Sequence, residues 1–203
     1  MVMRKAKSRR EAELRTRDVL GTEGLGELLA DVFDLDEKGR TKAVARVKTM
    51  QREGNDVCAT ERRGRGLDAT YSLEDAFRIV FCFALMDAGL TPKPAVDLFK
   101  ASWPDVVPAI RQAVREQEVT IVVIVRANGL GDYRRGASGV DVSITADGRS
   151  MEARGASGGG TSASSFSAVR IDMSDLCARM LRLFPRLSGL FPDVARRILL
   201  ELR

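Results

Sequence analysis

The sequence contains no histidine, and this absence narrows the chemistry that the protein can perform. Histidine is the commonest general base and transition-metal ligand, and it belongs to the usual Ser-His-Asp and Cys-His nucleophile systems. No other nucleophile with an adjacent base, and no cluster of metal ligands, is evident in the sequence. We therefore expect a protein that is not an enzyme, has no catalytic residues and binds no cofactor or metal.

Cysteines and long apolar runs are also scarce. The three cysteines, Cys58, Cys82 and Cys177, are odd in number and far apart, which favours reduced thiols over a disulfide framework. No run approaches the roughly 20 apolar residues of a membrane span, and the basic N-terminal arm lacks the apolar core of a secretory signal. Because 44% of the 203 residues are hydrophobic, the chain can still bury a core. We expect a folded, cytoplasmic protein without a membrane partner.

Positive charge is concentrated in one stretch of the chain. The net charge of +5 is modest for 33 bases and 28 acids. However, Gly21 to Glu37 contains six acids and no base, whereas Lys38 to Arg65 contains nine bases and three acids. Such local clustering favours a polyanionic partner, which we take to be double-stranded DNA.

Two amphipathic helices are predicted on either side of this change in charge. Apolar residues from Leu25 to Phe33 recur at spacings of three and four, which predicts a helix that ends before Gly39. A second, basic helix is expected from about Thr41, which we take as its N-cap. The inner side of this second helix is expected to carry Val44, Val47 and Met50.

A short hairpin and further helices follow the basic helix. Gly64 and Gly66 suit a tight turn between residues 57 and 70, with an arginine-rich tip. Ser-Leu-Glu-Asp at 72–75 resembles a capping box, and it precedes an apolar helix that Gly89 closes. Two more helices are expected, one from Thr91-Pro92 and a separate one from Trp103-Pro104 to about residue 117.

After residue 118 the pattern changes to short strands. Segments 119–126, 140–144 and 166–172 are rich in strand-forming residues, and two amphipathic helices separated near Pro185 and Gly189 end the chain. The fold class is therefore expected to be α+β. We expect a basic N-terminal arm at 1–20, a mainly helical winged helix-turn-helix domain at 21–117, and a small C-terminal α+β dimerisation or interaction domain at 118–203 with about three strands and two helices.

The order of these elements resembles the winged helix-turn-helix domain of the MerR family. Gly26–Phe33 is similar to the family's Gly-Glu-Leu-Ala opening, and Gln51–Gly54 is similar to the Glu-Arg-x-Gly that closes its recognition helix. Tyr71–Asp75 resembles the Tyr-Ser-x-Glu-Asp that follows its wing. The resemblance covers roughly Leu25 to Lys100 and implies a MerR-like, DNA-distorting module.

The sequence departs from the MerR pattern in three respects. The paired aromatic residues of the family's recognition helix appear here as Thr49-Met50, and the connector from Phe33 to Thr41 is expected to be long and acidic. The C-terminal third does not resemble the long dimerising coiled coil or the cysteine metal loop of metal-sensing relatives. Metal sensing is therefore not expected.

Nine residues are candidates for contacting DNA. Arg46 is the first choice for base readout, because bidentate recognition of guanine needs a guanidinium on the side of the helix that enters the groove. Arg63 and Arg65 are expected to follow the backbone or minor groove. The complete set is Arg40, Thr41, Lys42, Arg46, Lys48, Arg52, Arg62, Arg63 and Arg65.

The sequence therefore predicts a transcriptional regulator that is associated with the nucleoid. It would act as a homodimer on an inverted-repeat promoter site, because a monomer is not expected to bury the apolar stripe of the last helix at Leu190, Val194, Ile198 and Leu202. Two alternatives are an architectural, excisionase-like bending factor of phage or mobile-element type, and an adaptor that docks RNA polymerase or another protein. The simplest alternative is a solvated helix face that happens to be basic.

Overall fold

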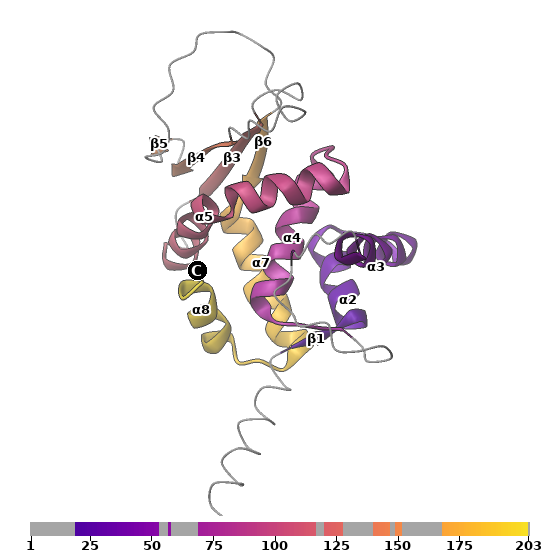
Figure 1. Ribbon diagram of the computed structural model, residues 1–203. Helices are drawn as coiled ribbons and strands as arrows, with labels where there is room; N and C mark the ends of the chain where they lie inside the picture. Colours follow the sequence, from indigo (N-terminus) through magenta and orange to yellow (C-terminus); the bar gives the residue numbers. More distant parts are fainter. Residues whose placement is uncertain are drawn as a thin grey trace, which may run out of the picture. The chain divides into compact units, whose positions relative to one another are not determined.

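The computed structural model describes residues 19–52, 57, 69–116, 120–127, 140–146, 149–151 and 168–202 (Figure 1). These residues combine helices with two antiparallel sheets, which is the α+β class that the sequence predicts. The elements in chain order are β1 (Leu20–Gly21), α2 (Thr22–Val32), α3 (Glu37–Arg52), β2 (Thr70–Tyr71), α4 (Leu73–Asp87), α5 (Pro92–Arg115), β3 (Ile121–Ala127), β4 (Val140–Ala146), β5 (Arg149–Met151), β6 (Ala168–Asp172), α7 (Met173–Ser188) and α8 (Pro192–Leu200).

The chain forms two compact units, each assembled from separate stretches of sequence. Unit 1 comprises Met1–Val80 with Arg179–Leu199, and unit 2 comprises Phe81–Ala178 with Leu200–Arg203. Helices α4 and α7 contribute residues to both units. The expected boundary after residue 117 falls inside unit 2, which begins at Phe81, and most of α7 and α8 belongs to unit 1. The division of function between 21–117 and 118–203 stays a prediction.

The N-terminal part of unit 1 is built on α2, α3 and a two-stranded sheet. Leu25, Leu28 and Leu29 of α2 are at most 1% exposed, as their spacing of three and four predicts. Strand β1 pairs antiparallel with β2, so that Leu20 lies opposite Tyr71. The Gln51 side chain at the end of α3 donates a hydrogen bond to the Tyr71 hydroxyl at 3.2 Å. The sheet therefore links the start of α2 to the segment that precedes α4.

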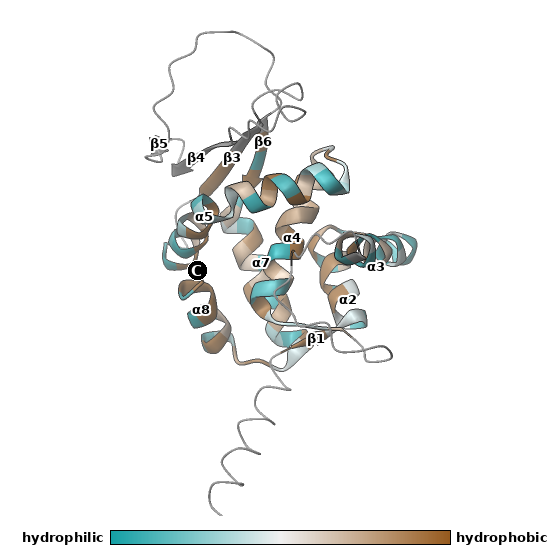
Figure 2. Ribbon diagram, viewed as in Figure 1, coloured by the Kyte–Doolittle hydropathy of each residue, from teal (hydrophilic) through white to brown (hydrophobic). Residues whose placement is uncertain are grey.

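Helix α4 begins at the capping box that the sequence predicts. The Asp75 N–H donates to the Ser72 hydroxyl oxygen at 3.1 Å, and the Ser72 N–H donates to an Asp75 carboxylate oxygen at 3.2 Å. The Ser72 hydroxyl also donates to that oxygen at 2.7 Å. Figure 2 shows that α4 is largely apolar, in contrast to α3. At its end Gly89 has a φ of 99°, and the Leu90 N–H donates to the Leu85 carbonyl, which confirms the expected stop.

Helix α5 starts at Pro92 as expected, but it continues without a break to Arg115. The expectation of a separate helix from Trp103-Pro104 is wrong. A proline removes one backbone hydrogen bond to the residue four positions earlier. Lys100, Pro104 and Pro108 are all exposed at this spacing, so water can solvate the carbonyls that the prolines leave unbonded. Trp103 instead packs against Phe99, with ring centroids 5.0 Å apart.

Unit 2 contains a four-stranded antiparallel sheet in the order β5-β4-β3-β6. The three expected strands are present as β3, β4 and β6, and α5 packs against β3 and β4. The short strand β5 pairs Arg149 with Ala146 and was not expected, because three residues give no periodic signal. Strand β6 runs directly into α7, where the Ser174 hydroxyl accepts a hydrogen bond from the Ile121 N–H at 2.8 Å.

The last two helices meet at Gly189, which has a φ of 75°. Pro185, expected to separate them, lies inside α7. Leu190 and Leu202 of the predicted apolar stripe are buried within one chain, whereas Val194 and Ile198 are half-buried and the neighbouring Phe191 is 75% exposed. Across the described ranges, each helix is too short or too polar to span a bilayer.

The capping box makes a specific contribution to stability. Replacing Ser72 with Ala removes the acceptor for the Asp75 N–H and a partner of the buried Asp75 carboxylate, so we expect a loss of about 1–2 kcal/mol in the free energy of unfolding. Urea denaturation measures this difference. Thr49→Ala is the control, because Thr49 is an exposed residue of α3 away from its N-cap, and alanine favours the helix. Equal stability of Ser72→Ala and the wild type would contradict the assignment.

Candidate nucleic-acid interface

A four-residue turn, Phe33–Asp36, joins α2 to α3. The Leu35 N–H donates to the Ala30 carbonyl at 2.9 Å, which is the six-to-one bond of a Schellman motif. Asp34 has a φ of 51°, the left-handed conformation that this motif requires. The expectation of a long connector is therefore wrong, and the turn has the length of a helix-turn-helix connection.

Helix α3 begins at Glu37, earlier than the sequence suggested. The Asp36 carboxylate accepts a hydrogen bond from the Gly39 N–H at 2.6 Å and so caps the helix. Thr41 lies inside the helix, where its hydroxyl donates to the Glu37 carbonyl at 3.1 Å. The expectation that Thr41 is the N-cap is wrong, because Asp36 is an equally good capping residue and occurs one turn earlier.

Helix α3 lies close against α2 at Gly26. A Cβ atom at this position would lie 2.8 Å from the Val44 Cγ2 atom, which is closer than real side chains come. Gly26 is buried and Val44 is half-buried. Glycine is therefore favoured here by the proximity of the Val44 side chain and not by a left-handed backbone conformation.

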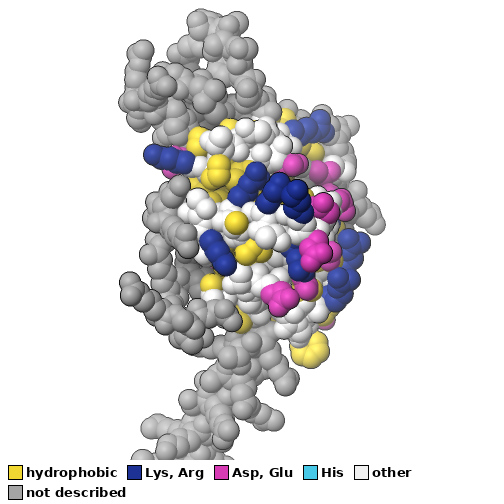
Figure 3. All heavy atoms as spheres, turned by 90° about the vertical axis from the view of Figure 1, so that its right-hand side faces the viewer, with side chains coloured by type: hydrophobic (Ala, Val, Ile, Leu, Met, Phe, Trp, Pro, Cys, Tyr) yellow, Lys and Arg dark blue, Asp and Glu magenta, His cyan; other side chains and the backbone are white. Residues whose placement is uncertain are grey.

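The two sides of α3 differ sharply in character. Ala43, Val47 and Met50 are between 1% and 3% exposed and form the buried side of α3. Ala43, and not the expected Val44, completes this buried side. The exposed residues of α3 between positions 41 and 49 are Thr41, Lys42, Ala45, Arg46, Lys48 and Thr49. Figure 3 shows basic and acidic side chains interspersed on the face that lies to the right in Figure 1, where α2 and α3 are drawn.

The acids of α2 neutralise part of the positive charge of α3. Helix α3 contains six bases and one acid, and α2 contains three acids and no base. Glu27 pairs with Arg40 across the two helices, with their charged atoms 3.9 Å apart. Asp31 instead pairs with Arg186 of α7 at 3.0 Å. Among the residues that the structure describes, Lys42, Arg46 and Lys48 form no ion pair, so their charge faces solvent.

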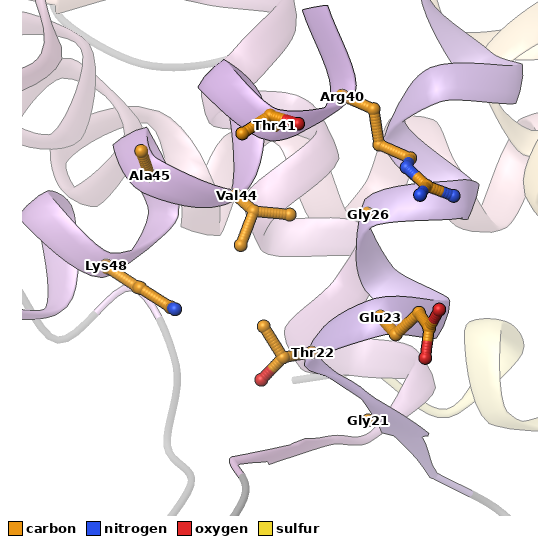
Figure 4. Close-up of a pocket in the computed structure, with 9 residues that line it drawn as sticks. All are labelled: Gly21, Thr22, Glu23, Gly26, Arg40, Thr41, Val44, Ala45 and Lys48. Atoms are coloured by element: carbon orange, nitrogen blue, oxygen red, sulfur yellow. The ribbon is translucent and has the colours of Figure 1, made fainter. Parts of the chain in front are cut away.

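A pocket of about 670 Å³ opens beside α3 where α2 begins. In Figure 4 the Lys48 side chain points toward Thr22, while Arg40 and Glu23 lie on the opposite side of the pocket. The lining comes from the start of α2 and from one side of α3, and consists of Gly21, Thr22, Glu23, Gly26, Arg40, Thr41, Val44, Ala45 and Lys48.

The expected DNA-contacting residues of α3 divide into two groups. Arg40, Thr41 and Lys48 line the pocket, and Lys42 and Arg46 are exposed residues of α3 that do not line it. Because successive residues are rotated by about 100° around the helix axis, the two groups lie on different sides of α3. All five lie on one helix, as the sequence predicts.

Four of the expected residues cannot be placed in the same way. Arg52 is the last residue of α3, and its side chain lies outside the described part of the structure. Arg62, Arg63 and Arg65, with the hairpin expected around them, also lie outside the described residues. Sequence reasoning missed Gly21 and Thr22, although a Gly-Thr pair directly before an apolar helical stripe is a signal for a helix start.

The cysteines of unit 2 do not resemble a reactive site. Cys82 and Cys177 are buried free thiols, as the sequence predicts for reduced cysteines. Burial, together with the nearby Asp172 carboxylate, raises the pKa of Cys177 far above that of an ordinary thiol. The thiol therefore stays protonated and unreactive at neutral pH.

Comparison with known proteins assigns this interface to no family. The sequence matches no protein-family model and no curated protein.

Packing between Gly26 and Val44 can be tested by a double-mutant cycle. We expect Gly26→Ala to destabilise the wild type by roughly 1 kcal/mol or more, because the added methyl group overlaps Val44. In a Val44→Ala background the same change should stabilise the protein, because alanine favours the helix by up to about 1 kcal/mol. Urea denaturation of the four proteins gives the coupling. The same effect in both backgrounds would contradict the close approach.

Proposed function

We propose that the protein is a sequence-specific double-stranded DNA-binding transcriptional regulator that acts as a homodimer on an inverted-repeat promoter site. The observation that supports this most strongly is the exposed basic side of α3. A four-residue turn joins α3 to α2, and α2 buries its own apolar side. An α-helix fits the major groove of B-DNA, and Lys and Arg neutralise its phosphates. Because Lys42 and Arg46 form no ion pair within the described residues, no bond to an acid must break before they contact DNA.

The DNA-binding domain that we propose is MerR-like. Three features support this likeness beyond the helix pair itself. The segment after the expected wing forms β2. This strand pairs with β1, the strand that directly precedes α2. Ser72 and Asp75 of the Tyr-Ser-Leu-Glu-Asp segment then cap α4. Gly26, in the segment that resembles the family's Gly-Glu-Leu-Ala, is the point of close approach to α3.

The proposed homodimer has support from the last helix. Phe191, Val194 and Ile198 follow each other at spacings of three and four, and none of them is fully buried within one chain. A second copy would remove this apolar surface from water. Two modules related by a twofold axis would also match an inverted repeat and increase affinity through linkage.

Arg46 is expected to determine sequence preference. Arg46→Ala should weaken binding to the site that the wild-type protein selects from random duplexes by roughly 10- to 100-fold, since one bidentate contact to guanine contributes about 1–3 kcal/mol. Binding to a random-sequence duplex should fall far less. Fluorescence anisotropy at fixed, near-physiological salt measures both affinities.

Arg115→Ala is the matched control, because Arg115 is an exposed arginine at the end of α5. It should leave both affinities near their wild-type values, and thermal unfolding should show that both variants stay folded. If Arg46→Ala leaves the affinity for the selected site unchanged, the assignment of Arg46 to base readout is wrong.

A further inference from the structure

The pocket between α2 and α3 is lined by two cations and a hydroxyl. Lys48 enters it from α3, Arg40 lines it from the first turn of the same helix, and Thr22 lines it from α2. Figure 4 shows the Lys48 side chain directed toward Thr22 across the opening. Its volume of about 670 Å³ is sufficient for a phosphate group with its ester substituents.

The charges around the pocket favour an anion. The pocket lining contains one acid, Glu23, and two bases, Lys48 and Arg40. Arg40 is only loosely engaged, since its guanidinium lies 3.9 Å from the Glu27 carboxylate and 36% of its side chain is exposed. Lys48 forms no ion pair within the described residues. The two lining bases exceed the lining acid by one charge, and Lys48 is the base that an incoming phosphate can pair with directly.

Backbone donors lie at the same place. Gly21 precedes α2 with an extended backbone, and no side chain caps the helix. The N–H groups of the first turn of a helix have no acceptor within that helix. These donors supplement the two cations, which remain the main attraction for the ligand.

We propose that this pocket binds one backbone phosphate of the DNA duplex, and that Lys48 and Arg40 thereby fix the position of α3 in the groove. The inference rests on the proposed function. It separates two roles along one helix: the pocket residues bind the backbone regardless of sequence, and Lys42 and Arg46, on another side of α3, are left to contact base edges.

Ethylation interference combined with Lys48→Ala tests this proposal directly. The full-length wild-type protein is bound to copies of its selected site that are ethylated at single phosphates, and a random-sequence duplex serves for the comparison of affinities. For the wild type, ethylation of one phosphate per half-site should weaken binding. For Lys48→Ala, that phosphate should no longer matter. Lys48→Ala should also weaken binding to both duplexes by a similar factor, about 3- to 10-fold, and lower the salt dependence by about one phosphate contact.

Arg46→Ala is the comparison variant, because it should retain the sensitivity to that phosphate while losing preference for the selected site. A second arm titrates inorganic phosphate into the DNA-free protein and follows the backbone amide signals of Thr22 and Glu23 by NMR, with Lys48→Ala as its control. This arm distinguishes a DNA phosphate from a free phosphate as the natural occupant.

Each result decides between the two proposals. Loss of sensitivity at one phosphate in Lys48→Ala supports the pocket as a backbone-phosphate site. An unchanged ethylation map in Lys48→Ala overturns it while leaving the regulator proposal intact. If the wild type binds neither duplex, both proposals fail, and amide shifts that require Lys48 would then identify a free-phosphate site instead.

Discussion

The close packing of α2 against α3 at Gly26 is the constraint on which the candidate interface depends. Because Gly26 has no side chain, the Val44 side chain can lie directly against α2. Ala43, Val47 and Met50 are then buried in the core. This orientation leaves Lys42 and Arg46 exposed, and it places Lys48 and Arg40 beside the start of α2. A methyl group at position 26 would overlap the Val44 side chain, so that side chain or the spacing of the two helices would have to change. The proposed binding surface is therefore a consequence of helix packing.

Much of the fold could be predicted from local chemistry. The spacing of Leu25, Leu28 and Leu29 identifies the buried side of α2, and Ser72 with Asp75 fixes the start of α4. The strand-forming segments after residue 118 correspond to β3, β4 and β6. These signals could be recognised because each depends on residues within a few positions of one another.

The remaining features depend on information that is not local. Pro104 was expected to start a helix, but its exposed position lets α5 continue through it. Asp36 and Thr41 are both good N-cap residues; the apolar pattern favours Thr41, whereas the structure has the cap at Asp36. The return of α7 and α8 to the N-terminal unit, and the pocket at Thr22, both require the tertiary arrangement. The basic residues of α3 could be named in advance, but their division between pocket and exposed side could not.

The central claim is that the protein reads the sequence of duplex DNA, and the most direct test is selection from genomic DNA. Purified full-length protein is incubated with sheared genomic fragments at near-physiological salt, and the bound fragments are sequenced. Recovery of a small number of sites that share an inverted repeat is the predicted result, because two copies of α3 would each contact one half-site. Uniform, weak recovery across the genome would contradict sequence-specific regulation.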